Sequence, residues 1–278
     1  MRRLRLVEVG PRDGLQNQPR VYSTADKQRF VEALFASGLG DLEITSFVRP
    51  DLVPQLADAE ALFPLVRRDD RRCLVLVANR RGLERAQAAG ATAISLICAA
   101  SDGFSRANTG KDAAAGLEIL QSLVAEARPG ASWLRGYVST CFRCPYDGPV
   151  PPERALALLD AVAQTGVDEV VVSDTLGDAT PEQVEALCRP LLDRYGPERV
   201  ALHLHDTAGR ALACAKRALE LGVRNLDGSV GGLGGCPFAP GANGNVATES
   251  LAALAERLGF ATGVDPTALR RARGVLEL

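Results

Sequence analysis

The sequence predicts an α/β protein, a (β/α)₈ TIM barrel with an additional C-terminal helix. Short apolar segments alternate with helical ones, and this unit occurs eight times at intervals of roughly 30 residues. Most of these segments are nearly continuously apolar, as in parallel strands that helices cover on both faces. A length of 278 residues suits one such barrel, and no linker divides the chain, so we expect a single domain over residues 1–278. A doubly wound open sheet shares this alternation and is the alternative.

The expected strands are runs of apolar and β-branched residues, with helical stretches between them. They are Leu4–Val9, Asp41–Phe47, Cys73–Ala78, Ala93–Cys98, Trp133–Ser139, Glu169–Ser173, Val200–His205 and Asn225–Val230. The segment Asp265–Leu278 follows the eighth unit and predicts the additional helix.

Several helix boundaries have recognisable signals. Ser23 with Asp26, and Thr109 with Asp112, have the spacing of a capping box at a helix start. Thr180 precedes a proline at the first helical position, which is another start signal. Glycines placed to adopt left-handed C-terminal caps follow the helical stretches at Gly38, Gly90, Gly166 and Gly222.

The composition excludes several classes of protein. The chain has 32 basic and 34 acidic residues, a formal charge of −2, and no basic stripe, so we expect no nucleic-acid partner. No apolar run approaches the roughly 18–20 residues that span a bilayer, and the charged start is not a secretory signal, so we expect no membrane partner. Seven cysteines are an odd number in a chain large enough for its own core, which favours a reducing cytoplasm over a disulfide framework.

Polar side chains occur where several predicted strands end. In a TIM barrel, the active site gathers at the carboxyl ends of the strands. We therefore expect these side chains to meet at one end of the barrel. They are Arg12, Asp13, Glu43, Asn79, Asp174, His203, His205 and Asp206. Several of them, including Asn79 and Asp174, have a simpler alternative role, which is to satisfy backbone groups at strand ends.

The only two histidines of the chain are His203 and His205. Side chains two residues apart on a strand point to the same face, so both imidazoles should enter the barrel mouth. Beside Asp13 and Glu43 they predict a site for a divalent metal, Mg²⁺, Mn²⁺ or Zn²⁺. The alternative is a pair of hydrogen-bonded histidines at a strand end.

A glycine-dense run, residues 231–237 and onward to Gly244, is too rich in glycine for a strand or helix and predicts a mobile loop. It contains Cys236, whose thiol could act as an acid or base over a bound substrate. The alternative is a tight turn with an incidental cysteine. A separate pair, Cys141 and Cys144, has the spacing of a redox couple or half of a structural zinc site with the histidines, and it is the rival interpretation.

These residues belong to motifs that resemble the hydroxymethylglutaryl-CoA lyases, within the metal-dependent barrel lyases and Claisen-condensing enzymes. The motifs follow one another along nearly the whole chain. They are residues 7–17 (VEVGPRDGLQN), 43–47 (EITSF), 135–139 (RGYVS), 144–146 (CPY), 174–177 (DTLG), 203–207 (HLHDT), 231–239 (GGLGGCPFA) and 241–249 (GANGNVATE). The glycine loop with its cysteine is the part that indicates a lyase rather than a synthase.

The resemblance implies cleavage of 3-hydroxy-3-methylglutaryl-CoA to acetoacetate and acetyl-CoA with Mg²⁺ or Mn²⁺, and it suggests a homodimer. By matching motif positions, the metal ligands would be Asp13, His203, His205 and Asn245. Arg12 would face the thioester carbonyl, Glu43 would support the ligands and proton transfer, and Cys236 would be the loop thiol. The base that takes the hydroxyl proton stays open between Asp13, His203 and Cys236.

The acyl-CoA substrate is expected to contact Arg12, Gln16 and Asp174, and Asn108 lies in a segment with Arg106 and Lys111 that could meet the CoA phosphates. Two departures from the family pattern affect the acyl pocket: serine at position 173 instead of glycine, and the segment 139–144. A longer-branched 3-hydroxy-3-alkylglutaryl-CoA is therefore an alternative substrate. A condensing synthase or aldolase of the same superfamily is the alternative activity, and a zinc-stabilised binding protein is the third interpretation.

Overall fold

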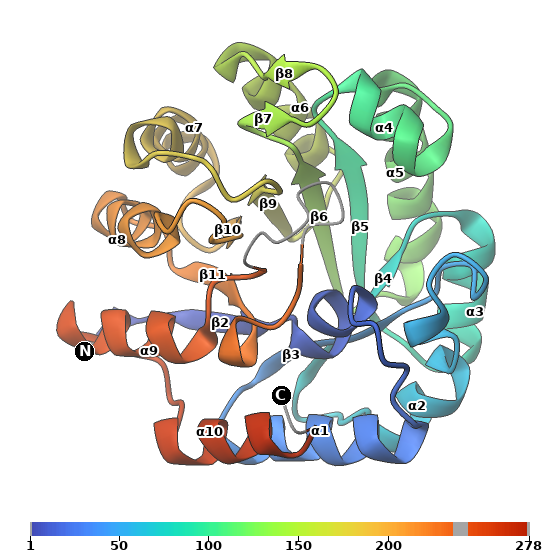
Figure 1. Ribbon diagram of the computed structural model, residues 1–278. Coiled ribbons are helices and arrows are strands. Elements are labelled where there is room, and N and C mark those ends of the chain that lie inside the picture. The colour runs from blue at the N-terminus through green and yellow to red at the C-terminus, as the bar shows by residue number, and fades with distance from the viewer. Residues whose placement is uncertain (1, 236–243, 277–278) are drawn as a thin grey trace.

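The computed structural model describes residues 2–235 and 244–276. Its centre is a closed barrel of eight parallel strands, and β11 pairs with β2 to complete the circle (Figure 1). The strands are β2 (Arg5–Glu8), β3 (Asp41–Ser46), β4 (Arg72–Val77), β5 (Ala93–Ala99), β6 (Trp133–Ser139), β9 (Glu169–Asp174), β10 (Val200–Leu204) and β11 (Asn225–Gly228). The predicted TIM barrel is confirmed, and the open-sheet alternative is wrong.

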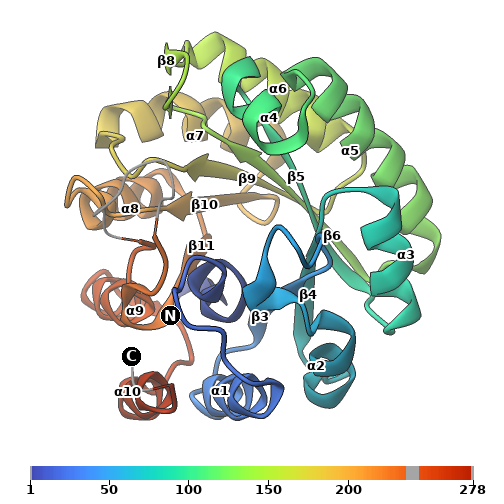
Figure 2. The same cartoon turned by 45° about the vertical axis from the view of Figure 1, so that its right-hand side comes forward.

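Helices surround the strands (Figure 2). They are α1 (Thr24–Ala36), α2 (Ala59–Val66), α3 (Arg80–Ala88), α4 (Asp102–Thr109), α5 (Ala113–Ala127), α6 (Pro152–Gln164), α7 (Pro181–Tyr195), α8 (Ala211–Leu221), α9 (Thr248–Arg257) and α10 (Pro266–Gly274). Two short strand pairs lie outside the barrel: β1 (Arg2–Arg3) with β12 (Phe260–Ala261), and β7 (Arg143–Cys144) with β8 (Gly148–Pro149). The predicted C-terminal helix is α10, which packs against α1 and ends at Gly274.

Most of the predicted helix signals are present. The Ser23 hydroxyl accepts from the Asp26 amide, and Thr180 forms a complete capping box with Gln183. The expected cap glycines all have positive φ angles: Gly38, Gly90, Gly166 and Gly222.

The capping box predicted for Thr109 is wrong. Thr109 is the last residue of α4, and Asp112 caps α5 by accepting from the Ala115 amide at 2.9 Å. Between the two helices, Gly110 has a φ of 73°, a left-handed conformation that ends α4. Aspartate is as good an N-cap as threonine, so the new helix starts from Asp112.

The inside of the barrel is partly charged. Arg135 and Tyr137 of β6 point inward with Asp227 of β11, and all three are buried and hydrogen-bonded to one another. Small apolar layers, such as Leu76 with Val171, fill the space beside them. This rigid interior supports the carboxyl ends of the strands, where the predicted site residues lie. In the described ranges, no helix is long and apolar enough to cross a membrane.

Candidate active site

A single π-helical turn, Gly10–Gly14, places Arg12 and Asp13 over the barrel mouth directly after β2. The amides of Arg12, Asp13 and Gly14 all donate to the Val9 carbonyl, at 3.1, 2.7 and 3.1 Å. A Cβ at Gly10 would lie 2.6 Å from Oε1 of Glu8, which accepts from the Gly10 and Val230 amides, so a larger residue there would have to displace this buried carboxylate. Both functional side chains are buried as a result.

Arg12 is anchored by two carboxylates. Its Nε and Nη2 atoms lie 2.6 and 2.5 Å from Oε2 of Glu43, and its Nη1 atom lies 2.5 Å from Oδ1 of Asp13. Burial alone would lower the pKa of the guanidinium, but the two carboxylates raise it above its usual range. Burial opposes ionisation of Asp13, but the Arg12 cation together with the interactions of His205 and His203 outweighs it and holds the Asp13 pKa well below its usual range. The turn therefore presents a fixed cation beside a fixed carboxylate.

Asp13, His203 and His205 form a buried group suited to a metal ion, with candidate ligand atoms within 4.8 Å of one another. The Nε2 atoms of His203 and His205 lie 4.0 and 3.6 Å from Oδ2 of Asp13. The predicted common orientation of the two imidazoles is confirmed, with ring centroids 5.2 Å apart. Burial lowers the pKa of His205, which favours the neutral imidazole that binds metals.

Asn245, which follows the glycine-rich segment in the sequence, lies beside this group. A backbone bridge joins it to His205, and its Nδ2 atom lies 2.8 Å from Oδ2 of Asp13. Its Oδ1 atom, like Nδ1 of His205, is buried without a hydrogen-bond partner among the described residues. Within the described ranges this amide oxygen therefore keeps its lone pairs for a metal ion. A carboxylate, two imidazoles and this amide together fit a divalent cation.

The second nitrogen of His203 contacts an acid. Its Nδ1 lies 3.0 Å from Oδ2 of Asp227, which also accepts from the Tyr137 hydroxyl at 2.9 Å. Burial would raise the pKa of Asp227, but the Arg135 cation and the bond to His203 outweigh it and lower the pKa to about 2. Asp227 is absent from the predicted site. The sequence does offer one indication of its role, because Asp227 is a charged residue within a predicted buried strand.

Of the predicted substrate-binding residues, only some lie beside the metal-binding group. Gln16 donates to Oδ1 of Asp13 at 2.8 Å and so belongs to the site. The Asp174 carboxylate accepts from the amides of its own loop, at Gly177 and Ala179, and burial raises its pKa to about 6. Asn108 is exposed on α4. Cys236 lies outside the described residues.

Asn79 and the cysteine pair of the rival interpretation all bond to backbone groups. Asn79 caps α3 by accepting from the Gly82 amide at 2.9 Å. Cys141 donates to the Val138 carbonyl, and the sulfur of Cys144 accepts from the Tyr146 amide. Within the described part of the chain, neither cysteine belongs to a metal-binding group. The zinc set of two cysteines and two histidines is therefore not formed.

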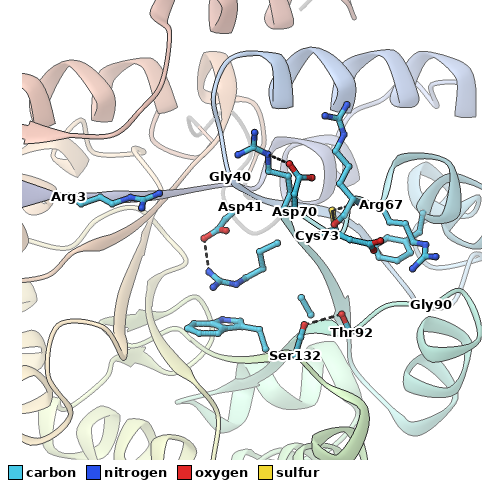
Figure 3. A pocket seen from close by; sticks show the side chains of 16 residues that line it. Arg3, Gly40, Asp41, Arg67, Asp70, Cys73, Gly90, Thr92 and Ser132 are labelled. Atoms are coloured by element: carbon cyan, nitrogen blue, oxygen red, sulfur yellow. Dashed lines mark hydrogen bonds and ion pairs between the residues drawn. The ribbon is translucent and has the colours of Figure 1, made fainter.

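A cavity of about 510 Å³ lies at the opposite end of the barrel (Figure 3). Its walls include the first residues of β3, β4 and β6, which are Asp41, Arg72 and Trp133. Arg72 pairs with Asp41 at 2.8 Å and lies 3.8 Å over the Trp133 ring, so its charge is compensated. The cavity contains none of the candidate site residues.

The sequence matches the family described as HMGL-like over residues 3–276. The chain belongs to the HMGL-like family.

Its relatives within this family carry lyase names. The chain is 40% identical to the hydroxymethylglutaryl-CoA lyase of Bacillus subtilis, over 95% of its own length and 88% of the relative's. It is also 40% identical to the (R)-citramalyl-CoA lyase of Chloroflexus aurantiacus, over 97% and 88% of the two chains. The crystal structure of the HMG-CoA lyase of Brucella melitensis is similar with a TM-score of 0.95 and 42% identity, covering 100% and 98%. The predicted resemblance is confirmed.

Proposed function

We propose that the protein is a 3-hydroxy-3-methylglutaryl-CoA lyase, which cleaves its substrate to acetoacetate and acetyl-CoA with Mg²⁺ or Mn²⁺. The observation that carries the proposal is the buried group of Asp13, His203 and His205 beside the Arg12–Glu43 ion pair. This group lies at the carboxyl ends of the strands, where TIM barrels carry their active sites. It does so in a chain whose relatives carry lyase names.

The cation would be held by Asp13, His203, His205 and Asn245. When bound, it lowers the pKa of the tertiary hydroxyl and orients that hydroxyl and the free carboxylate. Carboxylate and amide oxygens with imidazoles suit Mg²⁺ or Mn²⁺, whereas the structural zinc interpretation needed thiolates. Gln16 would keep Oδ1 of Asp13 in place through its hydrogen bond.

Arg12 would stabilise the negative charge that develops on the thioester oxygen as the carbon–carbon bond breaks. Its bonds to Glu43 and Asp13 use one N–H at each nitrogen, so Nη1 and Nη2 each keep a second donor. A guanidinium held in place before the reaction needs no reorganisation when charge forms, and such groups supply much of a catalytic effect. Glu43 would hold Arg12, and its buried Oε1 has no partner in the described ranges and is left for proton transfer.

Two protons have to move. The candidates for taking the hydroxyl proton are Asp13, His203 and Cys236. A His203 ring that holds the cation through Nε2 and donates from Nδ1 to Asp227 has no lone pair left, which favours the other two. The acetyl-CoA enolate must then be protonated, and we assign this step to the Cys236 thiol. The family motif that contains Cys236 carries this assignment, and the last described residue before it, Gly235, accepts from the Asn17 side chain at 3.0 Å.

The acyl-CoA substrate would extend from this site toward α4. Arg106, Asn108 and Lys111 are exposed there and could meet the CoA phosphates. The Asp174 carboxylate is occupied by its own loop, so we propose that it shapes the acyl pocket through that loop. We further propose a homodimer, by family resemblance, and a cytoplasmic location, which the six free buried cysteines of the described residues support.

A second substrate is favoured by one observation. The citramalyl-CoA lyase relative is as similar in sequence as the hydroxymethylglutaryl-CoA lyase of Bacillus subtilis. Cleavage of either thioester breaks the same kind of carbon–carbon bond and releases acetyl-CoA. The second product is acetoacetate from 3-hydroxy-3-methylglutaryl-CoA and pyruvate from citramalyl-CoA. Parallel assays of acetoacetate and pyruvate release therefore test the proposal. Acetoacetate release supports it, and pyruvate release alone would replace the substrate while keeping the reaction class.

A further inference from the structure

One of the two histidines has a carboxylate behind it. Nδ1 of His203 lies 3.0 Å from Oδ2 of Asp227, and both side chains are buried. His205 has no comparable partner, since its Nδ1 is buried without a hydrogen bond among the described residues. The two imidazoles of the proposed metal site are therefore not equivalent.

Asp227 is itself held from the other side. Nη2 of Arg135 lies 2.5 Å from its Oδ1, and the Tyr137 hydroxyl donates to its Oδ2 at 2.9 Å. Arg135 is fully buried and also pairs with Glu169 at 2.6 Å. This arrangement keeps Asp227 in one position as a charged acceptor.

An ionised carboxylate can only accept a hydrogen bond, so the proton between the two groups must lie on Nδ1 of His203. The lone pair of the neutral ring is then on Nε2, the atom that faces Oδ2 of Asp13. A carboxylate behind a ligating histidine fixes the tautomer and the ring orientation and makes the ligand more basic.

We propose that Asp227 is a positioning residue, which holds His203 in the tautomer and orientation that the metal requires. The inference rests on the proposed metal site and adds Asp227 to it as a residue that acts through His203. It predicts that the carboxylate of Asp227 contributes to metal affinity by roughly tenfold to a hundredfold, as such partners commonly do.

The first test measures the tautomer of His203 in the parent protein, and a variant serves only to assign the signals. Because the chain has only two histidines, ¹⁵N-histidine labelling gives just two imidazole spin systems. A His205→Asn variant assigns them. In metal-free protein at slightly alkaline pH, we expect a pyrrole-like Nδ1 and a pyridine-like Nε2 for His203. Protonation of His203 at Nε2 would overturn the proposal without any change to the network.

The second test measures Mn²⁺ affinity by electron paramagnetic resonance of the free ion. Asp227→Asn should weaken binding by about tenfold to a hundredfold. Glu169→Gln is the matched control, because it removes a buried carboxylate that contacts Arg135 but not His203, and its Mn²⁺ affinity should stay close to that of the parent. Equal affinity in Asp227→Asn and parent, or equal losses in the two variants, would contradict the role of Asp227. A parent that binds no Mn²⁺ would instead reject the metal site itself.

Discussion

The guanidinium of Arg12 contacts Oε2 of Glu43 through two nitrogens, Nε at 2.6 Å and Nη2 at 2.5 Å. This relationship ties the turn after β2 to the neighbouring strand β3, and both side chains are buried. Arg12 therefore reaches the barrel mouth in a fixed orientation, next to the group that would hold the metal.

Arg12→Gln should reduce turnover by on the order of 10²–10³, because the charge forming on the thioester oxygen loses its preorganised donor. Its Mn²⁺ affinity should stay near that of the parent, since Arg12 is not among the proposed ligands. Steady-state kinetics and Mn²⁺ titration measure the two quantities separately. Near-normal turnover would rule out this role for Arg12.

Chelation should lower the melting temperature of the protein, and added Mn²⁺ should restore it. Ligand that binds only the folded state stabilises it, by about 2.7 kcal/mol at a hundredfold excess over Kd. Asp13→Asn, which removes the charged candidate ligand, should show a much smaller Mn²⁺-induced shift in the same thermal unfolding experiment. An equal shift in this variant would mean that Mn²⁺ binds elsewhere.

Glu8 should make the protein less stable as pH rises through neutrality. Burial raises its pKa from 4.5 to about 7, so the folded state retains a proton that the unfolded chain releases. The stabilising effect of this proton is fully present below the pKa of Glu8 in the unfolded chain. It is lost as the pH rises through the pKa of Glu8 in the folded protein. The loss amounts to about 3 kcal/mol over that window.

Glu8→Gln tests this dependence. A neutral amide can accept from the amides of Gly10 and Val230 and donate to the Thr248 hydroxyl, so the contacts are retained. Urea unfolding of both proteins at about pH 5 and about pH 8 should show the variant gaining stability relative to the parent at the higher pH. A difference between the two proteins that does not change with pH would contradict the raised pKa.

Arg135→Met should destabilise the fold by about 3–5 kcal/mol, because Asp227 and Glu169 would be buried without their shared cation. The matched control is Arg143→Met, which breaks an ion pair between the exposed Arg143 and Asp178 and should cost little. Urea unfolding measures both. Similar costs for the two variants would show that the buried network contributes no more than a surface pair.

Features that depend on local sequence patterns could be predicted, and features that depend on contacts between distant residues could not. Most of the strands could be predicted because they are nearly continuous apolar runs, such as β4 and β9, and the shared face of His203 and His205 follows from the two-residue period of a strand. The contact between His203 and Asp227 could not, since it depends on how β10 and β11 align in the closed barrel. The turn at Gly10–Gly14 is likewise a local conformation without a distinct hydrophobic pattern.

The most direct measurement of the proposed activity is acetoacetate release from 3-hydroxy-3-methylglutaryl-CoA by EDTA-treated protein, before and after Mg²⁺ or Mn²⁺ is added. The proposed site predicts release only after the metal returns, with acetyl-CoA in equal amount, and none from Asp13→Asn. Undiminished release in EDTA, or no release from folded protein shown to bind Mn²⁺, would contradict it.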